Sequence, residues 1–188
     1  MSVPQAELPG SVVVRAMTRE DGPAFSGFAS QVPEGERRFL KEDLDDPAET
    51  FASFWLQENG RRLVAVEEGD GIVGVAGAFQ GVGWSSHVAE LHVLVSPAHR
   101  RHGVGRALAR AALVEALKLG CSQAYVEVVA EQEALVAMFQ DMGFEPAALL
   151  PDFVRDGAGE FHDLMLLTHR ADDQWGLSRV YGLDEVDA

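Results

Sequence analysis

Two hydrophobic patterns alternate along the chain and divide it into short strands and helices. Short runs of mostly β-branched or other apolar residues predict strands, whereas apolar residues that recur every three or four positions predict helices. On this basis we expect about six or seven strands, at 11–16, 61–67, 72–79, 87–95, 124–130, 145–150 and 161–169. Helices are expected over 19–31, 34–44, 47–58, 103–119 and 133–142.

Turn and cap residues agree with this division. Gly69-Asp70-Gly71 lies between the second and third expected strands and predicts a hairpin. Thr18 followed by Asp21 resembles a capping box at the start of the first helix, and Gly120 and Gly143 end the last two helices. A β-α-β crossover in the middle, with hairpins before and after it, predicts an α/β fold with a mixed sheet flanked by helices.

The length of the chain suits one domain. A sequence of 188 residues can bury a continuous core without disulfides or metal. We expect an N-terminal extension at 1–10, a globular domain over 11–170 and an acidic tail at 171–188. Trp175 and Tyr181 in the tail either dock on the core or on a second subunit, or the tail is a partly disordered terminus.

Charge and cysteine content limit the partners and the cellular compartment that we expect for this protein. Lys and Arg number 15 against 30 Asp and Glu, a net charge of −15, which repels nucleic acid and anionic lipid. We therefore expect neither nucleic acid nor a membrane as a partner. Cys121 is the only cysteine, so no intrachain disulfide or multi-cysteine zinc site forms. With no basic-apolar leader at the N-terminus and no spanning apolar run, the sequence predicts a cytoplasmic protein.

The strongest chemical signal lies where the strand at 87–95 gives way to the helix at 103–119. The first turn of a helix has unpaired N–H groups and a partial positive charge. Gly103 and Gly105 let an anion approach those amides with no side chain in between. Four arginines share this window: Arg100, Arg101, Arg106 and Arg110. The pattern predicts a site for a phosphate-bearing ligand, and a solvated basic loop is the alternative.

Two common phosphate motifs do not fit this stretch. A P-loop requires Gly-x-x-x-x-Gly-Lys-Ser/Thr, and the sequence contains no such run. A dinucleotide fingerprint requires a third Gly or Ala after Gly103 and Gly105, and that position is Leu108. Both interpretations are weak.

The run Arg100-Arg101-His102-Gly103-Val104-Gly105 matches the Arg/Gln-x-x-Gly-x-Gly/Ala signature of the GNAT superfamily of N-acetyltransferases. It follows the fourth strand and opens the third main helix, as it does in that family. Phe139-Gln140-Asp141-Met142-Gly143-Phe144 is similar to the family's Tyr-x-x-x-Gly-Phe segment. The order of elements from about residue 12 to 169 also resembles GNAT proteins, and 151–156 with 162–164 is similar to bacterial members of unassigned substrate.

The resemblance implies that the protein binds acetyl-CoA as a co-substrate. Backbone amides of 101–106 would hold the pyrophosphate, and the strand at 93–95 would pair with the pantetheine amides, much as an added peptide strand pairs with a sheet edge. In this family the fourth and fifth strands splay apart, which places the thioester between 93–95 and 124–130. The residues it implies for cofactor binding are Val93, Leu94, Val95, Arg100, Arg101, His102, Gly103, Val104, Gly105, Arg106 and Gln132.

The same resemblance implies direct acyl transfer to an amine, with no metal. An alkyl ammonium must lose a proton before it attacks, and the thioester oxygen then needs a donor, here the backbone N–H of Leu94 or Val95. Glu90 and Glu127 are the candidate bases, each with a structural ion pair as the alternative. His92 shares a face with Glu90 by the period-two rule, and a hydrogen-bonded structural histidine is the favoured interpretation.

One position departs from the family pattern. The usual general acid is a tyrosine, and the matching residue here is Phe139, which has no proton to donate. A thiolate is a passable leaving group without protonation. Tyr125 is a substitute acid, although packing is the favoured role for a core strand residue. Cys121 is interpreted as a small buried hydrophobe. The position of the usual asparagine is Gln132, which can still hydrogen-bond pantetheine or water.

The acceptor site is the least defined part of this prediction. In the family it is built by the first helices and the loop before the fourth strand, here 25–44 and 80–86. Acidic residues in 34–46 would favour a cationic amine of a small molecule or peptide, with a solvated charged helix as the alternative. The rival functions are an acyl-CoA sensor without turnover and an interaction module. A homodimer is expected from the resemblance alone.

Overall fold

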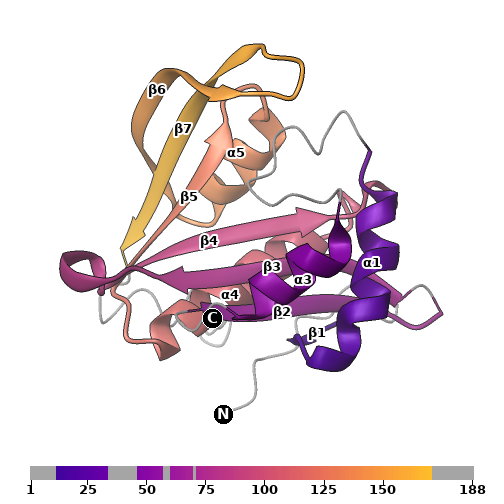
Figure 1. The fold of residues 1–188 in the computed structure, drawn as a ribbon. Coiled ribbons are helices and arrows are strands. Elements are labelled where there is room, and N and C mark those ends of the chain that lie inside the picture. The colour runs from indigo at the N-terminus through magenta and orange to yellow at the C-terminus, as the bar shows by residue number, and fades with distance from the viewer. Residues whose placement is uncertain (1–11, 34–45, 57–59, 70, 171–188) are drawn as a thin grey trace, which may run out of the picture.

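The computed structural model describes residues 12–33, 46–56, 60–69 and 71–170 (Figure 1). Three predictions lie outside the described residues: the helix over 34–44, the extension at 1–10 and the tail at 171–188. The division of the chain into an extension at 1–10, a domain over 11–170 and a tail at 171–188 stays a prediction.

Seven strands form one mixed sheet in the order β1-β2-β3-β4-β5-β7-β6. Neighbouring strands are antiparallel throughout, except that β4 and β5 are parallel. The strands are β1 (Val12–Ala16), β2 (Gly60–Glu67), β3 (Gly71–Gln80), β4 (Val88–Val95), β5 (Gln123–Val129), β6 (Glu145–Arg155) and β7 (Phe161–Arg170). The predicted α/β class, mixed pairing and β2–β3 hairpin are confirmed.

Helices cover both faces of the sheet. The described helices are α1 (Gly22–Gln31), α3 (Pro47–Leu56), α4 (Val104–Lys118) and α5 (Glu133–Asp141). The main core lies between the sheet and α4, where Leu108 and Ala112 are fully buried against β2–β5, and Phe139 of α5 belongs to the same cluster. On the opposite face, Phe25 and Phe28 of α1 pack on β2 and β3. Figure 1 shows α1 and α3 in front of β2–β4, with α4 behind.

A buried carboxylate fixes the approach to α1. A 3₁₀ turn at Arg19–Asp21 precedes the helix, and Asp21 is buried. Its carboxylate accepts two hydrogen bonds from the Arg15 guanidinium, at 2.8 and 2.6 Å, and one from the backbone N–H of Thr18 at 2.6 Å. The predicted pairing of Thr18 with Asp21 is therefore confirmed, and Arg15 is the partner that the sequence did not indicate.

This network makes stability dependent on pH. Hydrogen bonds from Arg15, and then from Thr18, lower the pKa of Asp21 to about 2 despite burial. Because the pKa is depressed in the folded state, the stabilisation is present above the ordinary aspartate pKa and is lost as pH falls from about 4 to 2. We expect Asp21→Asn to lower the free energy of unfolding at pH 7 by about 2 kcal/mol, with the difference from wild type vanishing near pH 2. Urea titrations across this range measure it, and an unchanged gap at low pH would contradict it.

The first strand of the last hairpin is longer than predicted. The pattern placed a strand at 145–150, but β6 continues to Arg155. Its register shifts against β7 between Pro146 and Ala148 and again between Leu150 and Val154, and Asp152 adopts a left-handed φ of 52°. Such bulges interrupt the alternation of inward and outward residues, so periodicity alone could not follow the strand past Pro151.

Candidate active site

A cleft opens where β4 and β5 separate. These parallel strands pair only at Val88–Glu90 with Gln123–Tyr125. Beyond Glu90, β4 remains paired with β3 up to Val95, so its other edge borders the opening. The cavity there has a volume of about 900 Å³ and is lined by both strands, the start of α4 and residues of α5. The separation of the two strands in Figure 1 agrees with the predicted splay.

The β4–α4 connection is fixed by hydrogen bonds at its first residue. The Ser96 backbone N–H donates to Val73 in β3, and the Ser96 hydroxyl lies 2.7 Å from Nδ1 of His99. Nε2 of His99 in turn lies 3.0 Å from the Glu67 carboxylate at the end of β2. Ser96 is fully buried, so this chain of groups fastens the loop to the sheet.

The turn that follows exposes helix amides to the cleft. Arg101 and Gly103 both adopt left-handed backbone conformations, with φ of 61° and 83°, and Gly103 is the N-cap of α4 without a side-chain cap. A Cβ added at Gly105 would lie 3.5 Å from Val95 and 3.6 Å from Met138, so this glycine sits close to the cleft wall. Uncapped N–H groups at the start of a 15-residue helix make a site for an anion.

The arginines of the window divide into two groups. Arg100, Arg101 and Arg106 line the cleft, whereas Arg110 is exposed and does not. The Arg100 Nε donates to the Val95 carbonyl at 3.1 Å, which ties the guanidinium to the end of β4. Arg106 pairs with Asp141 of α5 at 2.9 Å. The positive charge near the α4 start is thus held in place by neighbouring elements.

The predicted cofactor-binding residues gather at this cleft with two exceptions. Its lining includes Val93, Leu94, Val95, Arg100, Arg101, Gly103, Gly105, Arg106 and Gln132. The side chain of His102 is exposed, and that of Val104 is buried in the core beneath α4. Neither side chain lines the cleft, so these two residues border it only through their backbone groups.

The face of the sheet beneath α1 and α3 carries Glu90, His92, Tyr125 and Glu127 where β4 and β5 meet. Leu94 packs on that side, so Glu90 and His92 face it too by strand alternation. On β5, Val126 and Val128 belong to the α4 core, which leaves Tyr125 and Glu127 on the same face as Glu90. Glu90, His92 and Glu127 line the cleft at and just beyond the point where the strands separate.

Three of these groups form one hydrogen-bonded chain. The Tyr125 hydroxyl donates to Oε2 of Glu90 at 3.0 Å, and Nε2 of His92 lies 2.9 Å from Oε1 of the same carboxylate. Burial raises the pKa of Tyr125 well above its ordinary value, and the negative charges of Glu90 and Glu127 add to the shift. Tyr125 therefore stays protonated and acts as a donor to Glu90, beyond the packing role that its position in the sequence favoured.

Phe139 and Cys121 are both buried. Phe139 is 3% exposed, packs edge-on against Phe144 at 5.2 Å between ring centroids and lines the cleft, so its side chain supplies no proton there. Cys121 is buried, and burial raises the pKa of its thiol. It does not line the cleft, which agrees with the interpretation as a small hydrophobe.

The structure brings part of the expected acceptor region to the cleft. Phe25 of α1, which belongs to the expected region, lines the cleft, and so does Thr50 of α3, which lies outside that region. In the loop before β4, Trp84 is 95% exposed. The acidic stretch 34–45 lies outside the described residues, so its contribution stays a prediction.

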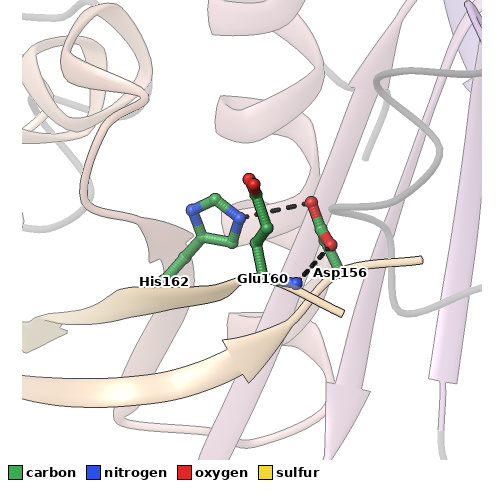
Figure 2. A group of neighbouring side chains, drawn as sticks. All are labelled: Asp156, Glu160 and His162. Carbon is green, nitrogen blue, oxygen red and sulfur yellow. Dashed lines mark hydrogen bonds and ion pairs between the residues drawn. The ribbon is translucent and has the colours of Figure 1, made fainter. Parts of the chain in front are cut away.

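One group of potential metal ligands occurs in the described part of the chain, and none of its three residues lines the cleft. Figure 2 shows Asp156, Glu160 and His162 at the β6–β7 turn, with ligand atoms within 4.8 Å of one another. Oδ1 of Asp156 accepts the backbone N–H groups of Ala158 and Glu160, and Oδ2 lies 3.4 Å from Nε2 of His162. These bonds account for the buried carboxylate as a turn-forming group.

The comparisons with known proteins agree with this geometry. The sequence model of the Acetyltransferase (GNAT) family matches residues 28–144, more than half of the chain. The chain belongs to the GNAT family. It is 27% identical over 145 residues to the uncharacterized N-acetyltransferase YjgM of Escherichia coli, a match that covers 73% of this chain and 84% of that protein.

One further relative and one solved structure are similar to this chain. N-acetyltransferase family 8 member 3 of the rat is 32% identical over 111 residues, 56% of this chain and 46% of the rat protein, so the chain spans about half the length of that relative. The yncA structure from Salmonella typhimurium, determined with its cofactor acetyl-CoA, superposes with a TM-score of 0.69 at 20% identity over 86% of this chain and 94% of that one. This likeness confirms the fold.

Acetyl-CoA is the acyl donor that GNAT proteins use, and the cleft of this chain fits it. The uncapped α4 start and the three arginines suit a pyrophosphate. The edge of β4 that does not pair with β5 offers backbone groups to the amides of a pantetheine arm. No helix in the described ranges is both long and apolar enough to cross a membrane.

Proposed function

We propose that the protein transfers the acetyl group of acetyl-CoA directly to a primary amine of a small molecule or peptide. The observation that supports it is the opening between β4 and β5, whose lining includes the uncapped start of α4 with three arginines and, where the strands separate, the carboxylates of Glu90 and Glu127. This lining suits a donor whose phosphates lie at α4 and an acceptor whose ammonium group approaches Glu90 and Glu127.

The reaction needs a proton acceptor, an oxyanion donor and a leaving group. The amine nitrogen forms a bond to the acetyl carbon, its proton passes to a base, and the carbon–sulfur bond breaks with its electron pair on sulfur. Phe139 supplies no acid, and a thiolate leaves without one because thiols are far more acidic than water. Glu90 and Glu127 are the candidate bases at this face of the cleft.

Strand geometry favours Val95 over Leu94 as the oxyanion donor. Backbone groups point alternately to the two edges of a strand. The N–H of Ser96 donates to β3, so the N–H of Leu94 points to β3 as well. The Val95 carbonyl accepts from Arg100 on the cleft side, which places the Val95 N–H on that side too. A donor at this edge can stabilise charge that develops on the thioester oxygen.

Two measurements test the proposal in sequence. Calorimetry with acetyl-CoA reports binding, and a free-thiol assay with a panel of amines, from amino acids to polyamines and lysine peptides, reports transfer. Turnover of at least one amine supports the proposal. Binding without turnover of any amine would favour a sensor, and no binding at millimolar acetyl-CoA would leave only an interaction module.

The arginines provide a matched pair for the phosphate end. We expect Arg101→Ala to weaken acetyl-CoA binding about 10-fold, the typical effect of losing one charge-assisted hydrogen bond to phosphate. Arg110→Ala removes an arginine from the same helix region but outside the cleft, and we expect its effect to stay within about 2-fold. Dissociation constants at low and high salt check both variants. Equal losses of acetyl-CoA affinity in the two variants would show that the arginines act only through their long-range positive charge and that Arg101 makes no specific contact.

A further inference from the structure

The turn before α4 contains a residue in an unfavourable backbone conformation. Arg101 adopts a left-handed φ of 61°, although it has a side chain, and it lies two residues before Gly103, the N-cap of α4. Such conformations cost free energy for residues with a Cβ, and they persist where the surrounding structure holds them. Arg101 lines the cleft at the uncapped helix start, so its conformation orients the backbone amides there. The groups that hold this turn therefore matter for an anion bound to it.

The turn is fastened at both ends. After it, the side chain of Val104 is buried in the core, which fixes the first residue of α4 against the sheet. Before it, the backbone N–H of Ser96 donates to the Val73 carbonyl of β3 at 2.9 Å, and the Ser96 hydroxyl lies 2.7 Å from Nδ1 of His99. His99 precedes Arg101 by two residues, so the position of this imidazole determines where the left-handed turn begins.

His99 is in turn held by Glu67, the last residue of β2. Nε2 of His99 lies 3.0 Å from the Glu67 carboxylate, and the two side chains are 16% and 25% exposed. Neither residue lines the cleft. The two positions are 32 residues apart in the sequence, so the contact connects the end of one strand to a distant turn. Through this Glu67–His99–Ser96 chain, the sheet restrains the residues that lead into α4.

The charge of Glu67 has the wrong sign for a direct role in phosphate binding. A carboxylate repels a phosphate, so if Glu67 acted through its field alone, its removal would strengthen the binding of an anion. Glu68 follows it directly, carries the same charge and is exposed. Glu67 in addition contacts His99. The two neighbouring glutamates therefore allow an effect of charge to be separated from an effect of position.

We propose that Glu67 and His99 are positioning residues for acetyl-CoA binding. They hold Arg101 in its left-handed conformation and thereby present the amides at the start of α4 to the pyrophosphate. The inference rests on the proposed function, which places the phosphates at this helix start, and deepens it by adding two residues outside the cleft that determine donor affinity. When either contact is lost, the turn relaxes, and part of the binding free energy is spent on ordering it again.

The test measures dissociation constants for acetyl-CoA by calorimetry in variants that separate the length of side chain 67 from its charge. We expect Glu67→Ala to weaken binding about 10-fold, the typical effect of losing a hydrogen bond to a charged group. Glu67→Asp keeps the charge but withdraws the acceptor from His99 by one methylene group, and it should also weaken binding. Glu67→Gln keeps the length and an acceptor oxygen, and should stay within about 3-fold of wild type. Glu68→Ala should bind as wild type does or slightly more tightly.

Two further measurements distinguish positioning from a general loss of structure. In Glu67→Ala, KM for acetyl-CoA should rise while kcat at saturation stays near wild type, because the candidate bases lie on β4 and β5 and not on this turn. His99→Ala should weaken binding at least as much as Glu67→Ala, and the double variant should lose no more than His99→Ala alone, since the carboxylate acts through the imidazole. Melting temperatures show that each variant is folded. If Glu67→Ala does not fold, Glu67→Asp and Glu67→Gln provide the same comparison.

The possible failures are distinguishable. If Glu67→Asp binds acetyl-CoA as tightly as wild type, or if the losses of Glu67→Ala and His99→Ala add in the double variant, the inference falls, while turnover of an amine by wild type leaves the proposed function standing. If wild type binds acetyl-CoA with the expected variant effects but acetylates no amine, the proposed transfer falls and the positioning role stands. If wild type binds no acetyl-CoA at millimolar concentration, both fall.

Discussion

Gly103→Glu is expected to weaken acetyl-CoA binding by about 100-fold or more, equivalent to roughly 3 kcal/mol. Gly103 caps α4 with a left-handed φ of 83°, and its backbone lines the cleft. A glutamate there places a carboxylate against the position inferred for the pyrophosphate, where like charges repel strongly in a partly desolvated site. Calorimetric titration with acetyl-CoA measures the loss, and CoA without the acetyl group should show the same loss because the phosphates are shared.

Gly120→Glu is the matched control. Gly120 follows the end of the same helix with a φ of 87°, a Cβ added there meets nothing within 4 Å, and it does not line the cleft. Each substitution forces a side chain into the left-handed region at a cost of about 1–2 kcal/mol of stability. The control should therefore melt at least as early as Gly103→Glu, since a carboxylate is less favourable at a helix C-terminus, and yet bind normally. Normal binding by Gly103→Glu would place the phosphates elsewhere.

The phosphate end of the site was predictable because its signals are local. A strand, a basic turn and two glycines within 14 residues define the α4 start, and the chain geometry there depends on few distant contacts. The order of elements, the β2–β3 hairpin and the parallel crossover from β4 to β5 follow from periodicity and turn chemistry in the same way. The fold could thus be derived in outline before any tertiary contact was known.

The catalytic end was not predictable in the same detail because it depends on strand register. Tyr125 and Glu90 are 35 residues apart, and they meet because β5 aligns with the last paired residue of β4. A shift of one residue would turn Tyr125 to the other face of the sheet. Periodicity placed Glu90 and His92 on one face but could not show that both oxygens of Glu90 are occupied. The Ser96–His99–Glu67 chain was missed for the same reason, since Glu67 reaches His99 across 32 residues.

Leu108→Ala is expected to lower the free energy of unfolding by about 3–4 kcal/mol. Truncating a fully buried leucine removes buried apolar surface and also leaves a cavity. Leu108 is completely buried beneath the sheet, and its Cδ1 lies 2.8 Å from the position that a Cβ at Gly74 of β3 would occupy. Leu108 therefore fills the space that a side chain at position 74 would need. Urea unfolding measures the loss, and Leu117→Ala, at a half-buried leucine on the same helix, should cost about 1 kcal/mol.

This complementarity predicts coupling between the two positions. Gly74→Ala alone should destabilise the fold by about 1–3 kcal/mol, because the new methyl group meets Leu108 and also lies 3.1 Å from the Leu94 carbonyl. In the double variant the methyl group occupies space that Leu108 has vacated. The double variant should therefore lose about 1 kcal/mol less unfolding free energy than the sum of the losses in the two single variants. Strict additivity would show that the backbone contact with Leu94 dominates. Since Leu94 lines the cleft, that result would also make Gly74 a determinant of the cleft wall, detectable as weaker acetyl-CoA binding in Gly74→Ala but not in Leu108→Ala.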